Sequence, residues 1–297
     1  SYDPKHGNLP EKGSFVCPAC GTKDKVINTI RSLPDNELLP TAPYAIEGYC
    51  PACAGEMSED LFGDSAAAQK QPTHLCNLHD NNGKFFKKMT AADLKRYQEA
   101  EKCWDNEKAN LPYPKSEIPI GEKTKSGLIA HHYLNWHQMF NPRQLLCLST
   151  LLKAIDGEKN QTLKEMLLCA FSDCVGRNNQ FCRYFNDRNT IQEIFSRHDY
   201  QPKNTIAEGN VFGDESIRGT YQQMFGRLLE GKAFNDNAFD LHRTISSAKP
   251  EKKYIDKIID GKQTNLKCGD SQSVISSIND KLEYVITDPP YAGNVNY

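Results

Sequence analysis

The sequence predicts an α/β protein that carries an inserted metal-binding ribbon and a helical segment. Three observations carry this prediction. An apolar run at residues 282–287 ends in Asp288-Pro289-Pro290-Tyr291, two Cys-Pro-Ala-Cys turns lie near the N-terminus, and amphipathic helical patterns fill the region between them. We expect a zinc ribbon over residues 1–80, a mainly helical insertion over 81–255, and part of the α/β core over 256–297.

Composition limits the class of protein. The chain has 297 residues, of which 25% are charged and 38% hydrophobic, as in a globular protein with room for two domains. It has no apolar run long enough for a membrane span, so we expect no membrane partner. The net charge of −2 provides no overall basic field, which argues against a stand-alone nucleic-acid binder. Lysine clusters at residues 84–88 and 249–257 are candidates for phosphate contacts, with solvated charged faces as the alternative.

The cysteines indicate a metal site. Of the eleven cysteines, Cys17, Cys20, Cys50 and Cys53 form two Cys-x-x-Cys pairs, which favours metal binding in a reducing, intracellular setting over disulfides. Strand-like stretches at residues 25–30 and 44–49 lie between the pairs. We therefore expect a zinc ribbon whose two turns sit on one small antiparallel sheet and hold Zn²⁺ by four thiolates. Such a closed site is structural, and the alternative is a set of redox or incidental cysteines.

Other cysteines have different expected roles. His74, Cys76 and His79 form a further cluster, which is either a second metal site or a polar loop without a fourth ligand. The remaining six sit mostly within apolar patterns and are expected in the core; these are Cys103, Cys147, Cys169, Cys174, Cys182 and Cys268.

The middle of the chain is predicted to be helical. Thr90 opens a polar helix that runs to about residue 106, and Asn141-Pro142 is an N-cap followed by proline at the first helical position. Further amphipathic helices are expected near residues 160–175 and 216–229. Several polar residues here are candidates for DNA contacts, while Trp136 and Phe140 are expected to pack on neighbouring helices. The candidates are His131, His132, Trp136, His137, Arg143, Arg177, Asn178 and Asn179, with packing as the alternative for Trp136.

A strand–turn–helix–strand pattern precedes the C-terminus. A short strand at residues 265–270 ends in Gly269-Asp270, a helix is expected over 271–278, and an apolar, buried strand over 282–287. In such sheets a carboxylate at a strand tip often faces the bound cofactor. Asp270 is therefore a candidate cofactor-binding residue, and a helix N-cap is the alternative.

The tetrapeptide Asp288-Pro289-Pro290-Tyr291 suits chemistry on an exocyclic amine. The Asp288 carboxylate and a backbone carbonyl can each accept a hydrogen bond from one –NH₂ group. Pro289 and Pro290 stiffen the turn, and Tyr291 offers a ring for stacking on a planar base. The motif predicts an amino-methyltransferase acting on adenine N6 or cytosine N4. The alternative is a proline turn with an incidental tyrosine.

One part of such an enzyme is not evident. S-adenosylmethionine requires a glycine-rich loop after a first strand. Residues 208–214, Glu-Gly-Asn-Val-Phe-Gly-Asp, are the nearest candidate, but they follow no strand and are better interpreted as a turn-rich loop. We therefore expect the chain to be a fragment whose cofactor loop lies outside these residues.

The chain resembles the prokaryotic adenine-specific DNA methylases that contain a zinc ribbon. The matching segments are the two Cys-Pro-Ala-Cys turns and residues 136–146, 207–213 and 285–291, with Asn294, Val295 and Tyr297 after the last. The resemblance implies a Rossmann-like fold dependent on S-adenosylmethionine, in which residues 1–255 are an insertion between cofactor loop and catalytic motif. It also implies a DNA substrate, a prokaryotic cytoplasmic setting, and restriction-modification or phage defence beside helicase or nuclease partners. Ala292 stands where an aromatic residue is expected.

The expected reaction is methyl transfer to adenine N6 of a flipped base. Asp288 and the Pro289 carbonyl would accept the amine hydrogens, Tyr291 would stack on the base, and Asn294 and Tyr297 would line the pocket. Two alternatives stay open. One is an amino-methyltransferase of RNA, such as tRNA, and the other is a non-catalytic zinc-ribbon module that binds nucleic acid or a partner protein.

Overall fold

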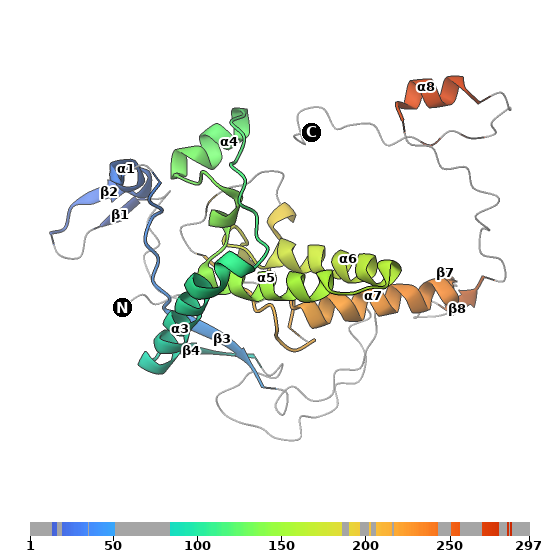
Figure 1. The fold of residues 1–297 in the computed structure, drawn as a ribbon, viewed down its shortest axis with the longest axis horizontal. Coiled ribbons are helices and arrows are strands. Elements are labelled where there is room, and N and C mark those ends of the chain that lie inside the picture. Colours follow the sequence, from blue (N-terminus) through green and yellow to red (C-terminus); the bar gives the residue numbers. More distant parts are fainter. Residues whose placement is uncertain are drawn as a thin grey trace. The chain divides into compact units, whose positions relative to one another are not determined.

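The computed structural model describes most of the chain between residues 84 and 242 and shorter segments on either side. The described residues are 14–16, 20–34, 36–50, 84–185, 190–196, 202, 206–215, 217–242, 251–255, 269–278, 284 and 286. They form two compact units, Ser1–Met224 and Phe225–Tyr297. Both units combine helices with small antiparallel sheets of two strands each among the described residues (Figure 1). The predicted mixture of helix and sheet is confirmed, whereas the Rossmann-like fold, the zinc ribbon and the domain borders near residues 80 and 255 stay predictions.

The N-terminal segment folds as two hairpins and a short helix. Strand β1 (Ser14–Val16) pairs with β2 (Lys23–Lys25), and β3 (Ala45–Tyr49) pairs with β4 (Lys84–Lys88). Residues 26–32, which include most of the strand predicted over 25–30, form helix α1 (Val26–Ser32) instead. The β-branched composition predicted a strand, but burial of Ile30 to 4% exposure and packing of α1 on the segment Ile129–His131 outweigh that weak preference.

Helix α3 (Ala91–Glu107) begins where it was predicted to begin. The Thr90 hydroxyl accepts a hydrogen bond from the Asp93 amide, and the Asp93 carboxylate accepts one from the Thr90 amide, which makes a reciprocal capping box. Lys87, on β4, donates to both carboxylate oxygens of Asp93 at 3.0 Å. This contact ties the β3–β4 hairpin to the start of α3. The 3₁₀ turn η2 (Lys108–Asn110) ends the helix.

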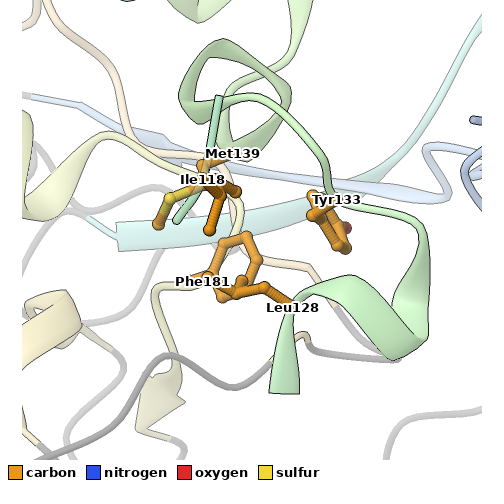
Figure 2. Packing of buried hydrophobic residues seen from close by; sticks show 5 residues of the cluster. All are labelled: Ile118, Leu128, Tyr133, Met139 and Phe181. Atoms are coloured by element: carbon orange, nitrogen blue, oxygen red, sulfur yellow. The ribbon is translucent and has the colours of Figure 1, made fainter. Parts of the chain in front are cut away.

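Short helical turns then build the first core cluster. These are α4 (Glu122–Gly127), η3 (Ile129–His131) and η4 (Trp136–Met139). Figure 2 shows the cluster, in which Met139 of η4 lies with Ile118, Leu128, Tyr133 and Phe181 from the segments between and around these turns. The Tyr133 ring meets the Phe181 ring edge to face, with ring centres 5.0 Å apart. Trp136 and Phe140 pack against this cluster, and Phe140 also packs against clusters formed by the long helices, so packing on neighbouring helices is confirmed for Phe140.

Two long helices carry the second cluster. Helix α5 (Pro142–Asp156) is capped by Asn141 and α6 (Gln161–Arg177) by Asn160, and the two lie side by side (Figure 1). The Asn141 cap agrees with the sequence prediction, and α6 lies close to the helix predicted near residues 160–175. The buried residues Leu148, Ala170, Cys174, Val211 and Met224 form the shared core. The first turn of α7 (Tyr221–Asp236), which contributes Met224, closes it.

The remaining elements are short. Strands β5 (Tyr184–Phe185) and β6 (Thr190–Ile191) form a small hairpin followed by η6 (Ile194–Ser196). In the C-terminal unit, β7 (Phe239–His242) pairs with β8 (Glu251–Tyr254), and Phe239 packs between Phe234 of α7 and Tyr254. Helix α8 (Ser271–Ser276) lies within the predicted helix.

The cysteines predicted in the core divide into two groups. Cys174 and Cys182 are fully buried, as expected, and Cys147 is half-buried. Cys103 on α3 and Cys169 on α6 are exposed, so the prediction is wrong for these two. Both lie on the outer, solvated faces of their helices, where an apolar-looking local pattern does not imply burial. Cys268 lies outside the described residues.

Candidate functional site

The first cysteine pair lies between strands β1 and β2 in the sequence. Val16 at the end of β1 pairs with Lys23 at the start of β2, and of the two cysteines between them Cys20 is described. Gly21 adopts a φ of +72°, a left-handed conformation that favours glycine, and it carries the chain from the cysteines into β2. Cys20 is exposed, with its thiol 3.3 Å from the Thr22 hydroxyl. Cys17 lies outside the described residues.

The second pair also follows a strand. Strand β3 ends at Tyr49, and the half-buried Cys50 comes next, whereas Cys53 lies outside the described residues. The prediction that both pairs sit on one sheet is wrong for the described strands, because β3 pairs with β4 and β1 with β2. The strands that precede the two pairs in the sequence, β1 and β3, therefore belong to different two-stranded sheets. A thiolate pair at the end of a strand suits one half of a tetrahedral zinc site, so these residues fit the metal by position. No cluster of three metal ligands occurs among the described residues, which include only two of the four cysteines.

Asp270 caps helix α8. Its carboxylate accepts hydrogen bonds from the Ser273 amide at 2.9 Å and from the Ser273 hydroxyl at 3.0 Å. These bonds to the charged form lower the pKa of Asp270. The N-cap interpretation is therefore confirmed for this residue, and the cofactor-binding role stays a prediction, because one carboxylate can cap a helix and still face a ligand.

The motif predicted to be catalytic lies outside the described part of the chain. Asp288, Pro289, Pro290, Tyr291, Asn294 and Tyr297 are all outside the described residues. Two residues of the apolar run that precedes them are described. Tyr284 is 84% exposed and Ile286 is 96% exposed, so the burial expected of this run is not observed for them. An alternating apolar strand is buried only where other strands or helices cover its faces.

Two segments that carry the family resemblance meet in space. Arg143, in the first turn of α5, donates through Nε to the Glu208 carboxylate at 2.6 Å. The Arg143 guanidinium also lies 5.7 Å from the centre of the Tyr97 ring on α3. Segments 136–146 and 207–213 are therefore joined by an ion pair that spans 65 residues of sequence. The half-exposed Arg143 keeps part of its guanidinium open to solvent.

Burial and neighbouring charges raise the pKa values of two groups near this ion pair, Tyr97 and Cys147. Burial raises the pKa of Tyr97 to about 12, and the carboxylates of Glu208 and Glu101 add to the effect. Burial also raises the pKa of the Cys147 thiol. Both groups are thus neutral near pH 7. The charged groups of this ion pair are Arg143 and Glu208, and their contact holds loop 206–215 against α5.

Arg177, which the sequence suggested for DNA contact, is instead a buried structural residue. It is 6% exposed, and its guanidinium pairs with Asp173 one turn earlier on α6 and with Glu193 at 3.0 Å beside η6. One of its nitrogens also lies 3.8 Å from the sulfur of Met224. A buried charge must be paired within the protein, and Arg177 therefore joins α6, η6 and α7. The DNA-contact prediction for Arg177 is wrong in this structure.

The two asparagines after Arg177 are also buried. Asn178 is 0% exposed and donates to the Cys174 carbonyl at 2.8 Å and the Gly219 carbonyl at 2.7 Å. Asn179 is 2% exposed and donates to the Val175 carbonyl. Their amides satisfy carbonyls at the end of α6 and in the loop before α7, so a DNA contact is excluded for them as they are placed here.

Two of the three histidines of this region bond to backbone carbonyls, and the third packs against an aromatic ring. Nδ1 of His131 donates to the Gly127 carbonyl at 2.6 Å, and Nδ1 of His132 donates to the Glu37 carbonyl at 3.0 Å. The latter bond ties the segment after α1 to the helical core. Burial lowers the pKa of His137, whose ring meets that of Tyr113 edge to face. Contact of these three histidines with DNA stays a prediction.

Sequence reasoning missed some of the partners in these interactions. The Asp173–Arg177 pair has the four-residue spacing of neighbours on one helix face, a signal that was available. Tyr97, Glu193 and Glu208 gave no such signal, because their contacts join segments far apart in the chain.

Comparison with known proteins identifies no relative. The chain matches no protein-family model, no curated protein and no solved structure. Membership of the zinc-ribbon methylase family therefore stays a prediction from the motifs themselves. Within the described residues, no helix has both the length and the apolar character needed to cross a bilayer.

Proposed function

We propose that this chain is part of an S-adenosylmethionine-dependent amino-methyltransferase that modifies adenine N6 in DNA. The single observation that carries the proposal is the sequence Val285-Ile286-Thr287-Asp288-Pro289-Pro290-Tyr291, an apolar run that delivers an acid, a rigid carbonyl and an aromatic ring in consecutive positions. The chain before it supports the same interpretation. Helix α8 starts directly after Gly269-Asp270, as required of the helix in a strand–turn–helix–strand unit.

The chemistry follows from the acceptors in the motif. Bound S-adenosylmethionine supplies an electrophilic methyl group. The Asp288 carboxylate and the Pro289 carbonyl each accept one N6 hydrogen, which turns the nitrogen lone pair out of conjugation with the ring and towards that methyl. S-adenosylmethionine, when bound, would give its methyl group to N6 and leave as the neutral thioether, and the N6 proton would pass to the Asp288 carboxylate that accepts a hydrogen bond from it. Tyr291 stacks on the flipped adenine, and Asn294 and Tyr297 line the pocket.

The cysteine turns have a structural role in this proposal. Cys17, Cys20, Cys50 and Cys53 hold one Zn²⁺ that stabilises the N-terminal hairpins, which have few apolar residues of their own. A site closed by four thiolates leaves no open coordination position for substrate, so the metal does not take part in methyl transfer.

The test is a methylation assay on the intact enzyme that contains this chain. Transfer of labelled methyl groups to adenine in DNA is expected, and transfer to tRNA alone would favour the RNA-directed alternative. Asp288→Ala should lower the rate at least ~10²-fold, the scale for removing a positioned electrostatic partner, with the melting temperature unchanged. Tyr291→Ala should weaken base binding by ~1–3 kcal/mol, whereas Tyr291→Phe should preserve it. A folded Asp288→Ala enzyme that methylates at the parental rate refutes the proposal.

A further inference from the structure

The β3–β4 hairpin has one occupied face and one face that is covered only in part. Side chains alternate between the faces of a strand, so Phe85 and Lys87 lie on one face and Phe86 and Lys88 on the other. The first face is filled. Lys87 is bound to Asp93, and the Phe85 ring lies so close over Gly48 that a Cβ there would be 2.2 Å from the ring. The second face is covered only in part: Tyr184 of β5 packs beside Phe86, which is still 57% exposed, and Lys88 is also exposed.

The neighbours of Phe86 hold it as a fixed surface ring. Tyr184 of β5 meets it edge to face, with ring centres 6.4 Å apart and planes at 80°. Burial raises the pKa of Tyr184, and the carboxylate of Glu47, which pairs with Phe86 across the sheet, adds to the effect. Edge-to-face packing leaves one broad side of the Phe86 ring without an aromatic partner among the described residues.

Lys88 supplies an available positive charge on the same face. It pairs across the sheet with Ala45, whose small side chain does not obstruct it, and it forms no ion pair within the described ranges. Residues two apart on a strand are separated by about 7 Å, so the long lysine side chain reaches the backbone of a base stacked on Phe86. An exposed ring beside a lysine that pairs with no described carboxylate offers the two contacts, stacking and charge, by which proteins bind single-stranded nucleic acid.

We propose that this face of the β3–β4 hairpin binds single-stranded nucleic acid, with a base stacked on Phe86 and a phosphate held by Lys88. An apolar polypeptide is a poorer occupant, because it would bury the Lys88 charge without a partner. The inference rests on the proposed function and extends it. It names a contact of the nucleic-acid substrate outside the catalytic motif, on an element that ends immediately before Cys50.

The experiment measures binding of the 297-residue chain to a fluorescent DNA single strand of about 20 nucleotides, longer than typical site sizes, over a range of salt concentrations. Phe86→Ala should weaken binding about 10- to 100-fold, the range for losing one stacked base, while Phe86→Trp should retain it. Lys88→Ala should reduce the slope of log affinity against log salt by ~0.7, the value for one phosphate contact on a single strand. Lys88→Arg should keep the parental slope.

Matched controls separate this surface from general effects. Phe212 is 56% exposed on a loop, and Lys102 is exposed on α3, so Phe212→Ala and Lys102→Ala should bind as the parent does. The inference is overturned if Phe86→Ala binds normally, if Phe212→Ala loses as much affinity, or if an acidic peptide binds as tightly and depends equally on Phe86. The inference is also overturned if Phe86→Ala loses affinity for duplex DNA but not for the single strand. Circular dichroism confirms that each variant is folded.

The binding assay needs neither S-adenosylmethionine nor Asp288, so the two proposals can fail separately. If Phe86→Ala weakens binding but the intact enzyme methylates no nucleic acid, only the proposed function is wrong. If methylation of DNA is found and Phe86→Ala binds normally, only this inference is wrong. An RNA strand of the same sequence, tested in parallel, shows whether the surface discriminates between the two sugars.

Discussion

At the scale of single residues, Asp93 is the clearest titrating group. Hydrogen bonds from the Thr90 hydroxyl, from Lys87 and from the Thr90 amide lower its pKa to about 2. The unfolded chain has a value near ~3.9. Because the folded pKa is the lower one, these contacts contribute their full stability above about pH 4, and that contribution is lost as the pH falls towards 2.

We therefore predict that stability falls over this acid range in the parent and falls less in Asp93→Asn, which cannot gain the proton. Denaturant unfolding between about pH 2 and pH 5 measures the difference, and a side-chain NMR titration reports the pKa directly. If the free energy of unfolding changes equally with pH in the two proteins, protonation of Asp93 does not affect stability.

Gly209 is required by close packing. A Cβ at this position would lie 2.6 Å from Asn178 Oδ1 and 3.0 Å from the Arg177 carbonyl oxygen. Asn178 is fully buried and bonded to two carbonyls, so it cannot move aside at low cost. We predict that Gly209→Ala lowers the free energy of unfolding by about 1–3 kcal/mol, the usual range for overpacking.

The matched control is Gly176→Ala. Gly176 lies in helix α6, and nothing lies within 4 Å of an added Cβ. Alanine there should stabilise the protein by up to about 1 kcal/mol, because it favours the helix. Guanidinium unfolding of both variants gives the comparison, and equal effects of the two substitutions would contradict the packing argument.

At the scale of elements, the two N-terminal hairpins carry the metal prediction. We expect about one equivalent of zinc in purified protein, held by sulfur at ~2.3 Å. Cys20→Ser or Cys50→Ser should lower the zinc content and loosen these hairpins, because their few apolar residues form no adequate core alone. Metal analysis and X-ray absorption measure content and ligation.

Cys103→Ser is the control for this prediction, since Cys103 is an exposed cysteine on α3 and should not affect the metal. Two results would show that these thiols do not hold the ion. One is that parent protein purified under reducing conditions contains no zinc, and the other is that Cys20→Ser and Cys50→Ser both keep their zinc.

At the scale of the whole molecule, the glycines of loop 206–215 bear on cofactor binding. Gly209 lies against Asn178, and a Cβ at Gly213 would be 2.7 Å from the Thr220 side chain. Both glycines therefore serve packing between protein segments, whereas a cofactor loop needs its glycines open to the ligand. This agrees with the prediction that residues 208–214 form a turn-rich loop.

We accordingly predict that a protein of these 297 residues binds S-adenosylmethionine weakly and shows no turnover. Isothermal titration calorimetry tests this, with the intact enzyme as the positive control. Tight binding at a one-to-one ratio would mean that a cofactor loop lies within these residues and that the proposed division of the enzyme is wrong.

The long helices could be predicted from the sequence because their signals are local. Thr90, Asn141 and Asn160 each bond to a backbone amide three residues later, and the apolar spacing of α5 spans a single helix. Helix α1 could not be predicted, because its short β-branched sequence favours a strand and only the burial of Ile30 against another segment decides otherwise.

The sequence by itself determined the helix caps, the two cysteine turns and the chemistry expected of Asp288-Pro289-Pro290-Tyr291, since each depends on residues within a few positions of one another. Only the tertiary structure decided that Arg177 is buried, that Arg143 binds Glu208, and that β4 pairs with β3 to leave Phe86 and Lys88 on a face that is covered only in part. These outcomes depend on which distant segments meet. That choice follows from the burial of apolar surface by the whole chain, and no local spacing records it.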